Sequence, residues 1–297
     1  MDFPGSFGDH ILPEEIHKIN LSFIVNKFAK RRGGTAGNVS YSLGLLKTSH
    51  TLFSVAGHDI EDYKEKFQEM GIDMSKVVIS KTKYTPTGFA MTDKTNNQIW
   101  GFFYGAAEDS VKLQLKKVAK KNDLVLVGPA GADASMAMVK QCVDLKISYM
   151  FDPGFILTQV TDVALTFGVT HAAYLIGNDY EIELIKSRVK NWKTLFAKKT
   201  VITTLGEKGA LVEDQGKKYT IKPVKPRKVI DPTGAGDAWR SGFLAGLDRN
   251  FDRQTCGQMG AVAASFALEK YGTQEHTYSL STFKKRYRQT YGTLLKL

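Results

Sequence analysis

The sequence has no long apolar run and very few cysteines. No uninterrupted apolar stretch approaches the roughly 18 residues of a membrane-spanning helix, so no membrane partner is predicted. The first residues, Met1 to Gly5, lack the basic start and apolar block of a signal peptide. The two cysteines, Cys142 and Cys256, lie far apart without metal-ligand spacing. A disulfide between them is conceivable, but reduced, buried thiols in a cytoplasmic protein are the favoured interpretation.

Several common nucleotide-binding and hydrolase motifs are also absent. The chain has no G-x-x-x-x-G-K-[ST] segment, which excludes a P-loop NTPase. Gly234 and Gly236 are spaced like the start of a dinucleotide fingerprint, but Trp239 stands where that fingerprint needs a small residue. The protein-kinase motifs and G-x-S-x-G are missing. The six histidines form no H-E-x-x-H pair, so a zinc hydrolase has little support.

Basic residues, in contrast, are abundant. Lys and Arg number 41 against 30 Asp and Glu, which gives a formal charge of +11. One group, Lys112, Lys116 and Lys120, has the helical spacing that is typical of a solvated helix face. A basic surface attracts anionic nucleotides and can bind nucleic acid weakly. Because no RNP-like, zinc-finger or helix-turn-helix motif accompanies the charge, no specific nucleic-acid partner is predicted.

From about residue 122 onward, short apolar strands alternate with helical segments. With 297 residues and 42% hydrophobic content, the chain can bury a large core. Strands separated by helices imply βαβ units and a mostly parallel sheet that is covered on both faces. The predicted strands are 123–129, 147–153, 172–176 and 200–204, and the predicted helices are 135–145, 163–167, 180–195 and 238–247.

The first hundred residues have a different pattern. Two of their strands are separated by the turn-rich segment 93–97, which indicates a hairpin. The predicted strands are 21–25, 88–92 and 98–103, and the predicted helices are 37–46 and 62–70. We therefore expect a small β-rich lid made of residues 1–29 and 85–105. The lid is expected to rest on an α/β core made of residues 30–84 and 106–297.

The segment Asp231-Pro-Thr-Gly-Ala-Gly-Asp237 carries the clearest chemical information. It lies between the apolar strand end Val229-Ile230 and the apolar helical segment 238–247. Its glycines allow a sharp turn and leave N–H groups unpaired at a helix N-terminus, which binds anions. An acid there can accept the proton of an attacking hydroxyl while the N–H groups hold a transferred phosphoryl group. The alternative is an ordinary glycine-rich turn with Asp237 as a helix cap.

Four motifs resemble those of the PfkB family of ribokinase-like carbohydrate kinases, and they follow the family's order over nearly the whole chain. Residues 231–244 resemble the family's C-terminal signature. Gly33–Asn38 resembles the family's N-terminal glycine motif. Asn178–Glu181 resembles its N-x-x-E motif, and Thr204–Gly209 resembles its nucleotide-side turn. The resemblance implies a three-layer α/β/α sandwich with a mostly parallel sheet and a small β lid. It also implies ATP-dependent phosphoryl transfer with Mg²⁺.

The resemblance assigns roles at the reacting centre. Asp237 is expected to be the general base that takes the proton of the acceptor hydroxyl. The residues expected to donate N–H groups to the γ-phosphoryl are Gly234, Ala235 and Gly236.

Other residues are expected on the ATP side. Glu181 and Asn178 are expected to order the Mg²⁺ shell through water, since Mg²⁺ keeps most of its waters. Asn178 can also cap the helix that follows, and the two roles are compatible. The residues expected along the triphosphate are Thr204, Gly206 and Gly209. Taken alone, Gly209 would be interpreted as a hairpin turn residue.

The acceptor side is expected to involve four residues. Gly34 and Asn38 resemble ligands of sugar hydroxyls, because Gly34 permits close approach and the Asn38 amide is both donor and acceptor. The alternative for Asn38 is a structural cap. Phe89 and Phe102 resemble lid aromatics that stack on a base or cover a sugar, and the alternative for both is simple core packing.

Residues 3–13, 17–18 and 21–23 look like the lid region of bacterial-type adenosine kinases, and residues 268–275 look like their tail. The leading hypothesis is a kinase that moves the γ-phosphoryl group of ATP to a primary hydroxyl of a nucleoside, adenosine first. One alternative is the same chemistry on a free sugar such as ribose or fructose. Another is a catalytically weak protein that binds a nucleotide or nucleoside. The sequence does not decide whether a monovalent cation is required near Asp231 or whether two chains form a homodimer through the lid.

The sequence departs from the family pattern in two places. The family's first strand, which carries an aspartate for the sugar hydroxyls, would lie upstream of Met1, so we expect the central sheet to lack it. Phe155 and Ile156 stand where the adenosine kinases have amide side chains that help to hold the nucleoside. Apolar side chains cannot donate those hydrogen bonds. This second departure weakens the case for adenosine as the acceptor, and it does not affect the expectation of phosphoryl transfer.

Overall fold

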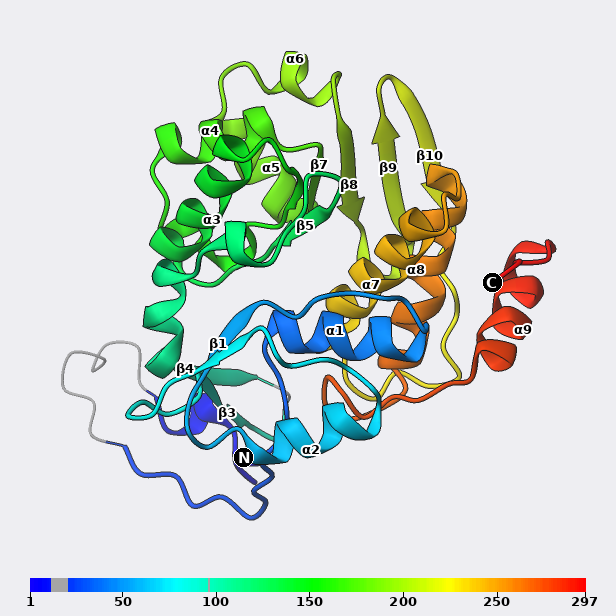
Figure 1. Cartoon of the computed structure of the whole chain (residues 1–297). Coiled ribbons are helices and arrows are strands. Elements are labelled where there is room, and N and C mark those ends of the chain that lie inside the picture. Colours follow the sequence, from blue (N-terminus) through cyan, green and yellow to red (C-terminus); the bar gives the residue numbers. More distant parts are fainter. Residues whose placement is uncertain (12–20, 96) are drawn as a thin grey trace.

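The main sheet is mixed, with a parallel part and an antiparallel part. The computed structural model describes residues 1–11, 21–95 and 97–297. The sheet order is β10-β9-β8-β7-β6-β5; β5 to β8 are parallel, and β9 and β10 are antiparallel to their neighbours (Figure 1). The strands are β5 (Leu124–Val127), β6 (Ser148–Phe151), β7 (Tyr174–Asn178), β8 (Thr200–Thr204), β9 (Ala210–Asp214) and β10 (Lys217–Ile221).

Each face of this sheet has its own hydrophobic core. The helices are α1 (Thr35–Leu45), α2 (Glu61–Glu69), α3 (Ala132–Asp144), α4 (Asp162–His171), α5 (Asp179–Arg188), α6 (Trp192–Phe196), α7 (Ala235–Asp248), α8 (Arg253–Ala267) and α9 (Leu280–Tyr291). In β6, Met150 packs with residues of α1, α7, α8 and α9, whereas Tyr149 and Phe151 pack with residues of α3, α4 and α5. Since successive strand residues point to opposite faces, the sheet lies between two helical layers. The predicted three-layer sandwich is confirmed.

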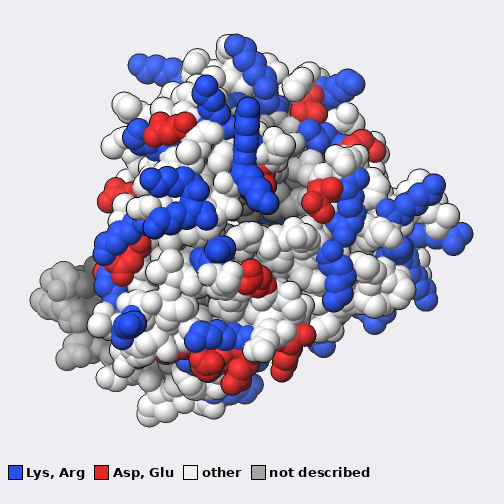
Figure 2. Space-filling model, viewed as in Figure 1, with Lys and Arg blue, Asp and Glu red and all other residues white. Residues whose placement is uncertain are grey.

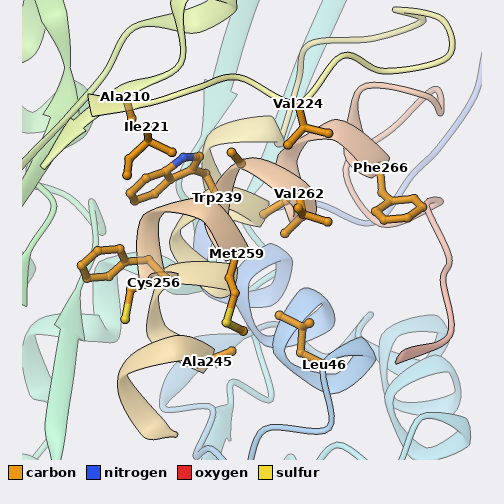
Figure 3. Packing of buried hydrophobic residues seen from close by; sticks show 14 of the residues in the cluster. Leu46, Ala210, Ile221, Val224, Trp239, Ala245, Cys256, Met259, Val262 and Phe266 are labelled. Carbon is orange, nitrogen blue, oxygen red and sulfur yellow. The ribbon is translucent and has the colours of Figure 1, made fainter. Parts of the chain in front are cut away.

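Helices α7 and α8 pack so closely that Gly242 has no room for a side chain. A Cβ added there would lie 2.4 Å from the carbonyl oxygen of Met259. Around this contact Trp239 lies toward Ala210 and Ile221 of the sheet, whereas Met259 lies toward Ala245 and Leu46 (Figure 3). Because α7 begins within the 231–237 motif, at Ala235, this packing fixes the position of that motif against the rest of the fold.

A separate hairpin lies beside the N-terminal segment. Strands β3 (Thr87–Thr92) and β4 (Gln98–Phe103) pair antiparallel with each other outside the main sheet. Asp2 forms a β-bridge with Thr92, and the buried Asp93 carboxylate accepts a hydrogen bond from the N–H of Phe7 at 3.0 Å. Residues 12–20 of the predicted lid lie outside the described residues.

Two predicted elements differ from the structure, and one hairpin was not predicted. The strand predicted at 21–25 is wrong: these apolar residues form no ladder within the described chain, and the Ile24 side chain is 86% exposed. The helix predicted at 180–195 is two helices, because the chain becomes extended at Val189, whose side chain is buried in the core. The sequence patterns also do not predict the hairpin of β9 and β10, whose two-residue turn places Gln215 and Gly216 at positive φ.

A further parallel pair, β1 (Ser54–Ala56) and β2 (Val77–Ile79), forms its own two-stranded sheet. In the described part of the chain, β5 is therefore the last strand of the main sheet on that side. The sheet that carries the candidate site thus consists of six described strands.

The cysteines agree with the sequence-based interpretation. Both cysteines are free and buried. The single helix face expected from Lys112, Lys116 and Lys120 is wrong, because Lys112 ends one 3₁₀ helix, Lys116 lies in another and Lys120 lies in neither, although all three are exposed. Basic side chains are spread over the face seen in Figure 2, with acidic side chains between them. Lys112 and Lys140, for example, each pair with an aspartate one helical turn away. Among the described residues, no helix is both long and apolar enough to cross a membrane.

Candidate active site

The 231–237 motif forms a turn that leads into α7. Gly234 precedes the helix with φ +79°, in the left-handed region that favours glycine. The N–H of Ala235 donates back into the turn at 3.2 Å, so one of the three predicted donors is already engaged. The N–H groups of Gly234, Gly236 and Asp237 have no hydrogen-bond partner in the described chain. They can therefore bind an anion at the positive end of α7.

Asp237, in the first turn of α7, is tied to α1 through a chain of hydrogen bonds. Nδ2 of Asn38 donates to Oδ2 of Asp237 at 2.7 Å. Nε2 of Gln274 donates to Oδ1 of Asn38 at 2.9 Å and to the Tyr63 hydroxyl at 2.5 Å. Because Gln274 occupies the acceptor end of the Asn38 amide, the donor end must face Asp237. Asn38 is thus a buried partner of the predicted base, with both ends of its amide engaged.

The surroundings of Asp237 change its acidity. Burial raises the pKa of Asp237 to about 6, although the Arg240 guanidinium and the Asn38 hydrogen bond act in the opposite direction. The nearby Asp152 carboxylate adds to the increase in pKa. A carboxylate with this pKa is mostly ionised at neutral pH and is a better proton acceptor than an exposed aspartate. The side chain therefore has the properties of a general base.

Arg240 forms a buried ion pair beside this base. Its Nε and Nη2 donate to Oδ2 and Oδ1 of Asp152 at 2.5 and 2.7 Å. The two side chains are 11% and 2% exposed. Burial works against the charged guanidinium, but the contact with Asp152 outweighs it and holds the pKa of Arg240 above its ordinary value. Since Asp152 directly follows β6, the pair ties α7 to the carboxyl edge of the sheet.

Asn178 and Glu181 form the start of α5 at the same edge. Oδ1 of Asn178 accepts from the N–H of Glu181, and Oε2 of Glu181 accepts from the N–H of Asn178, both at 2.8 Å. This reciprocal arrangement is a capping box, so the predicted cap is present. Burial raises the pKa of Glu181. Its Oε1 takes no part in the capping box, which uses Oε2.

This arrangement is compatible with Mg²⁺ held through water. The described residues contain no cluster of three or more His, Cys, Asp or Glu side chains that could ligate a metal directly. Mg²⁺ is commonly bound through one or two carboxylates, several waters and substrate phosphates. The Oε1 atom of Glu181 is an acceptor of the kind that a water of such a shell requires.

The remaining ATP-side residues lie on β8 and the turn after it. The register of β7 and β8 places Thr204 opposite Asn178. Gly206 begins a short 3₁₀ turn, and Gly209 follows it at φ +93° and leads into β9. A Cβ at Gly209 would lie 2.1 Å from the carbonyl oxygen of Ile221, so packing alone requires glycine there.

Phe89 and Phe102 lie on the hairpin of β3 and β4. Gly88 is opposite Phe102, and Gly101 is opposite Phe89. Paired residues share a face and successive residues alternate, so Phe89 and Phe102 point to opposite sides of the hairpin. They are 52% and 72% exposed, which makes them surface residues and not core residues. A ligand lying on one face of the hairpin would contact only one of them.

Gly34 completes the predicted acceptor side, and Phe155 and Ile156 are the two apolar replacements noted in the sequence. Gly34 precedes α1 at φ +84° with open space around it, which permits close approach of a ligand. Ile156 is fully buried in the core and cannot contact a ligand in this structure. Phe155 is 54% exposed, so only this one of the two apolar replacements is accessible.

Sequence patterns do not single out Arg240, Asp152 or Gln274. Arg240 carries a weak signal, because its spacing of three from Asp237 places both on one side of a helix. Asp152 follows a buried strand, which is where ligand-binding residues of α/β sheets occur. Gln274 has no such signal, since it lies in a connection between two helices and contacts Asn38 across 236 positions of sequence.

Comparisons with known proteins agree with this geometry. A match to the pfkB family of carbohydrate kinases covers residues 5–279. A nucleoside kinase of Methanocaldococcus jannaschii is 31% identical over 267 residues, which are 88% of this chain and 87% of that protein. A nucleoside kinase of Methanothermobacter thermautotrophicus is 29% identical over 291 residues, 94% and 92% of the two chains. The chain therefore belongs to the pfkB family of carbohydrate kinases, and it is a phosphotransferase with an alcohol group as acceptor.

A solved structure supports the same assignment. Burkholderia thailandensis nucleoside kinase in complex with inosine aligns with a TM-score of 0.89 and 27% identity, over 99% of this chain and 96% of that one. This similarity confirms the ribokinase-like fold.

Proposed function

We propose that this chain is a nucleoside kinase that transfers the γ-phosphoryl group of ATP to a primary hydroxyl, with adenosine as the first acceptor to test. One observation carries the proposal: Asp237 is hydrogen-bonded to Asn38 at the start of a helix where the N–H groups of Gly234, Gly236 and Asp237 are open. A base and an anion-binding turn thus lie within one helical turn. The similarity to nucleoside kinases over most of the chain supports a nucleoside as acceptor.

In the proposed reaction, Asp237 accepts the proton of the acceptor hydroxyl as that oxygen forms a bond to the γ-phosphorus. The bond between the γ-phosphorus and the β–γ bridging oxygen breaks, and ADP leaves with the electron pair. The open N–H groups of Gly234 and Gly236 stabilise the charge on the transferred phosphoryl group. Asn38 orients the Asp237 carboxylate through its hydrogen bond.

Glu181 and Asn178 would hold Mg²⁺ through water at the carboxyl edge of β7. When bound, the ion supplies positive charge that offsets the charge of the phosphates. Thr204, Gly206 and Gly209 would lie along the triphosphate at the neighbouring end of β8. The carboxyl ends of the strands are where open α/β sheets bind their ligands.

We further propose that residues 1–29 and 85–105 form a lid over the acceptor. On one face of its hairpin, Phe102 stacks on Trp100 with ring centroids 5.5 Å apart and planes inclined by 7°. A flat, partly exposed aromatic surface suits stacking against a nucleobase and offers little to the hydroxyls of a free sugar. The lid therefore favours a nucleoside over a sugar.

A substrate panel tests the proposal. The purified chain is incubated with Mg-ATP and, separately, with adenosine, inosine, cytidine, ribose and fructose, and ADP and the phosphorylated product are measured. We expect product with nucleosides, adenosine among them. Product from sugars alone would contradict the nucleoside assignment, and Asp237→Asn protein is the control for contaminating kinases.

A free sugar is the second candidate acceptor. The exposed apolar side chain of Phe155 favours it, because the protein lacks an amide there to hold a nucleoside. The same panel separates the two acceptors. Micromolar binding of nucleotide or nucleoside without formation of ADP would instead indicate a binding protein.

The lid is also a candidate contact between two subunits. Its hairpin exposes Ile99, Phe102 and Phe103 by 42%, 72% and 47%. Pairing of two lids would bury part of this apolar surface. Analytical ultracentrifugation of the wild type and of Phe102→Asp protein tests this contact, with a dimer expected for the wild type alone.

A further inference from the structure

Arg240 has one nitrogen that its buried partner does not use. Nε and Nη2 both donate to Asp152, whereas Nη1 has no hydrogen-bond partner among the described residues. A Cβ built on Gly236 would lie 2.8 Å from this Nη1. A cationic N–H donor therefore lies beside the first turn of α7, where the backbone N–H groups of Gly236 and Asp237 are open.

The position of Nη1 follows from the helix and from the ion pair. Side chains of a helix lean toward its N-terminus, so Arg240 reaches back over Gly236, four residues earlier. The two-point contact with Asp152 fixes the plane of the guanidinium and with it the direction of Nη1. Asp152 itself directly follows β6, and its N–H donates to the carbonyl oxygen of Val127 at 3.0 Å.

An anionic ligand at this site needs the positive charge of Arg240, because carboxylates surround it. Asp152, Asp237 and Glu181 all interact electrostatically with the guanidinium. A phosphoryl group that enters this site brings further negative charge close to three carboxylates. A buried arginine does not lose its proton, and its charge acts strongly where water is excluded. The Asp152 contact uses Nε and Nη2 alone, so Nη1 remains as a donor for a ligand at the turn.

We propose that Arg240 is a catalytic residue whose Nη1 donates to the transferring phosphoryl group beside the N–H groups of Gly236 and Asp237, and that Asp152 positions it. The inference rests on the proposed kinase function. Arg240 gives up no proton and forms no covalent bond. The proton passes to Asp237, the acceptor oxygen gains the phosphorus, and ADP leaves, while Arg240 stabilises the charge that develops.

The first test compares two buried arginines. Arg286, on α9, is 12% exposed and pairs with Glu269 at 3.0 Å. Arg286→Met and Arg240→Met therefore both remove a buried guanidinium and leave one carboxylate without its arginine partner. For Arg240→Met we expect kcat to fall by about 10²- to 10³-fold, as for the removal of one oxyanion donor. For Arg286→Met we expect kcat to stay within about threefold of the wild type.

A double variant distinguishes a loss of catalysis from a folding defect. Arg240→Met leaves the buried Asp152 carboxylate unpaired, so Asp152→Asn/Arg240→Met is measured as well. The same loss of kcat is expected. Calorimetry adds a readout independent of turnover: ADP with aluminium fluoride, which mimics the transferring phosphoryl group, should bind at least about tenfold more weakly to the double variant. Binding of ADP alone should be unchanged.

Three results would overturn the inference. The first is a double variant whose kcat lies within about threefold of the wild type. The second is full recovery of its kcat at high pH, which would mean that Arg240 acts only by keeping Asp237 ionised. The third is unchanged binding of the aluminium fluoride complex. A wild type that makes no ADP with any acceptor would instead end the proposed kinase function, and the binding comparison would still decide whether Arg240 contacts the phosphoryl group.

Discussion

The start of α7 and the hairpin of the lid differ in how their side chains are held. At α7, Asp237 is bonded to Asn38, and Arg240 is bonded at two points to Asp152. In the hairpin, Phe102 makes a ring contact and is otherwise largely exposed. The groups proposed for phosphoryl transfer are thus held in place without substrate, whereas the aromatic surface is open to a ligand. The difference indicates that the chemistry of the site is more closely determined than its choice of acceptor.

The largest expected effect is at Asp237. Asp237→Asn keeps the size of the side chain but removes its ability to accept a proton, so turnover should fall by at least about 10²-fold. ATP binding should be retained, because the backbone N–H groups remain. Steady-state formation of ADP and calorimetric titration with ATP measure the two properties. Asp248→Asn, at the other end of α7, is the control, and unchanged turnover of Asp237→Asn would refute the base.

The pH dependence should show the same group. Burial raises the pKa of Asp237 to about 6, and the protonated acid cannot serve as base. Arg240 and Asp152 are the charged groups that act on it, in opposite directions. We expect kcat/KM to be level near neutral pH and to fall about tenfold per pH unit below about pH 6. A level profile down to pH 4 would contradict the assignment, and lid variants should keep the acid limb.

A smaller effect is expected at Gln274, which we infer to be a positioning residue. Gln274→Leu frees the Asn38 amide to turn, so that Asp237 loses a hydrogen bond that lowers its pKa. The acid limb should move to higher pH, and turnover at neutral pH should fall about tenfold, which matches one hydrogen bond to a charged group. Gln258→Leu, which removes the amide that accepts from Tyr287, is the control. An unmoved acid limb would count against the inferred role.

The smallest effect is expected in the lid. Because Phe89 and Phe102 point to opposite faces, alanine at only one of them should raise KM for the nucleoside, by about tenfold if a base stacks there. The value of kcat should change little in either variant. Initial rates over a range of nucleoside concentrations measure both. Equal increases in KM for the two variants would show that the hairpin does not bind the acceptor with a single face.

Local residues explain why much of the core was predictable. The pattern of apolar residues predicted β5 to β8 and most helices, since those elements depend on spacing over a few positions. Asn178 and Glu181 cap a helix three residues apart, so their contact could be inferred from sequence. The predicted strand at 21–25 failed because a strand also needs a partner, and alternation of apolar residues does not supply one.

By itself, the amino-acid sequence determined the α/β class, the glycine turn before α7 and the acid that follows it, because these depend on residues close together in the chain. Only the tertiary structure decided that Asp152 holds Arg240, that Gln274 orients Asn38, and that the two lid phenylalanines face apart. The two hydrogen-bonded contacts join residues that are 88 and 236 positions apart. They exist because helices and strands pack in one particular way, and no local pattern of residues records that packing.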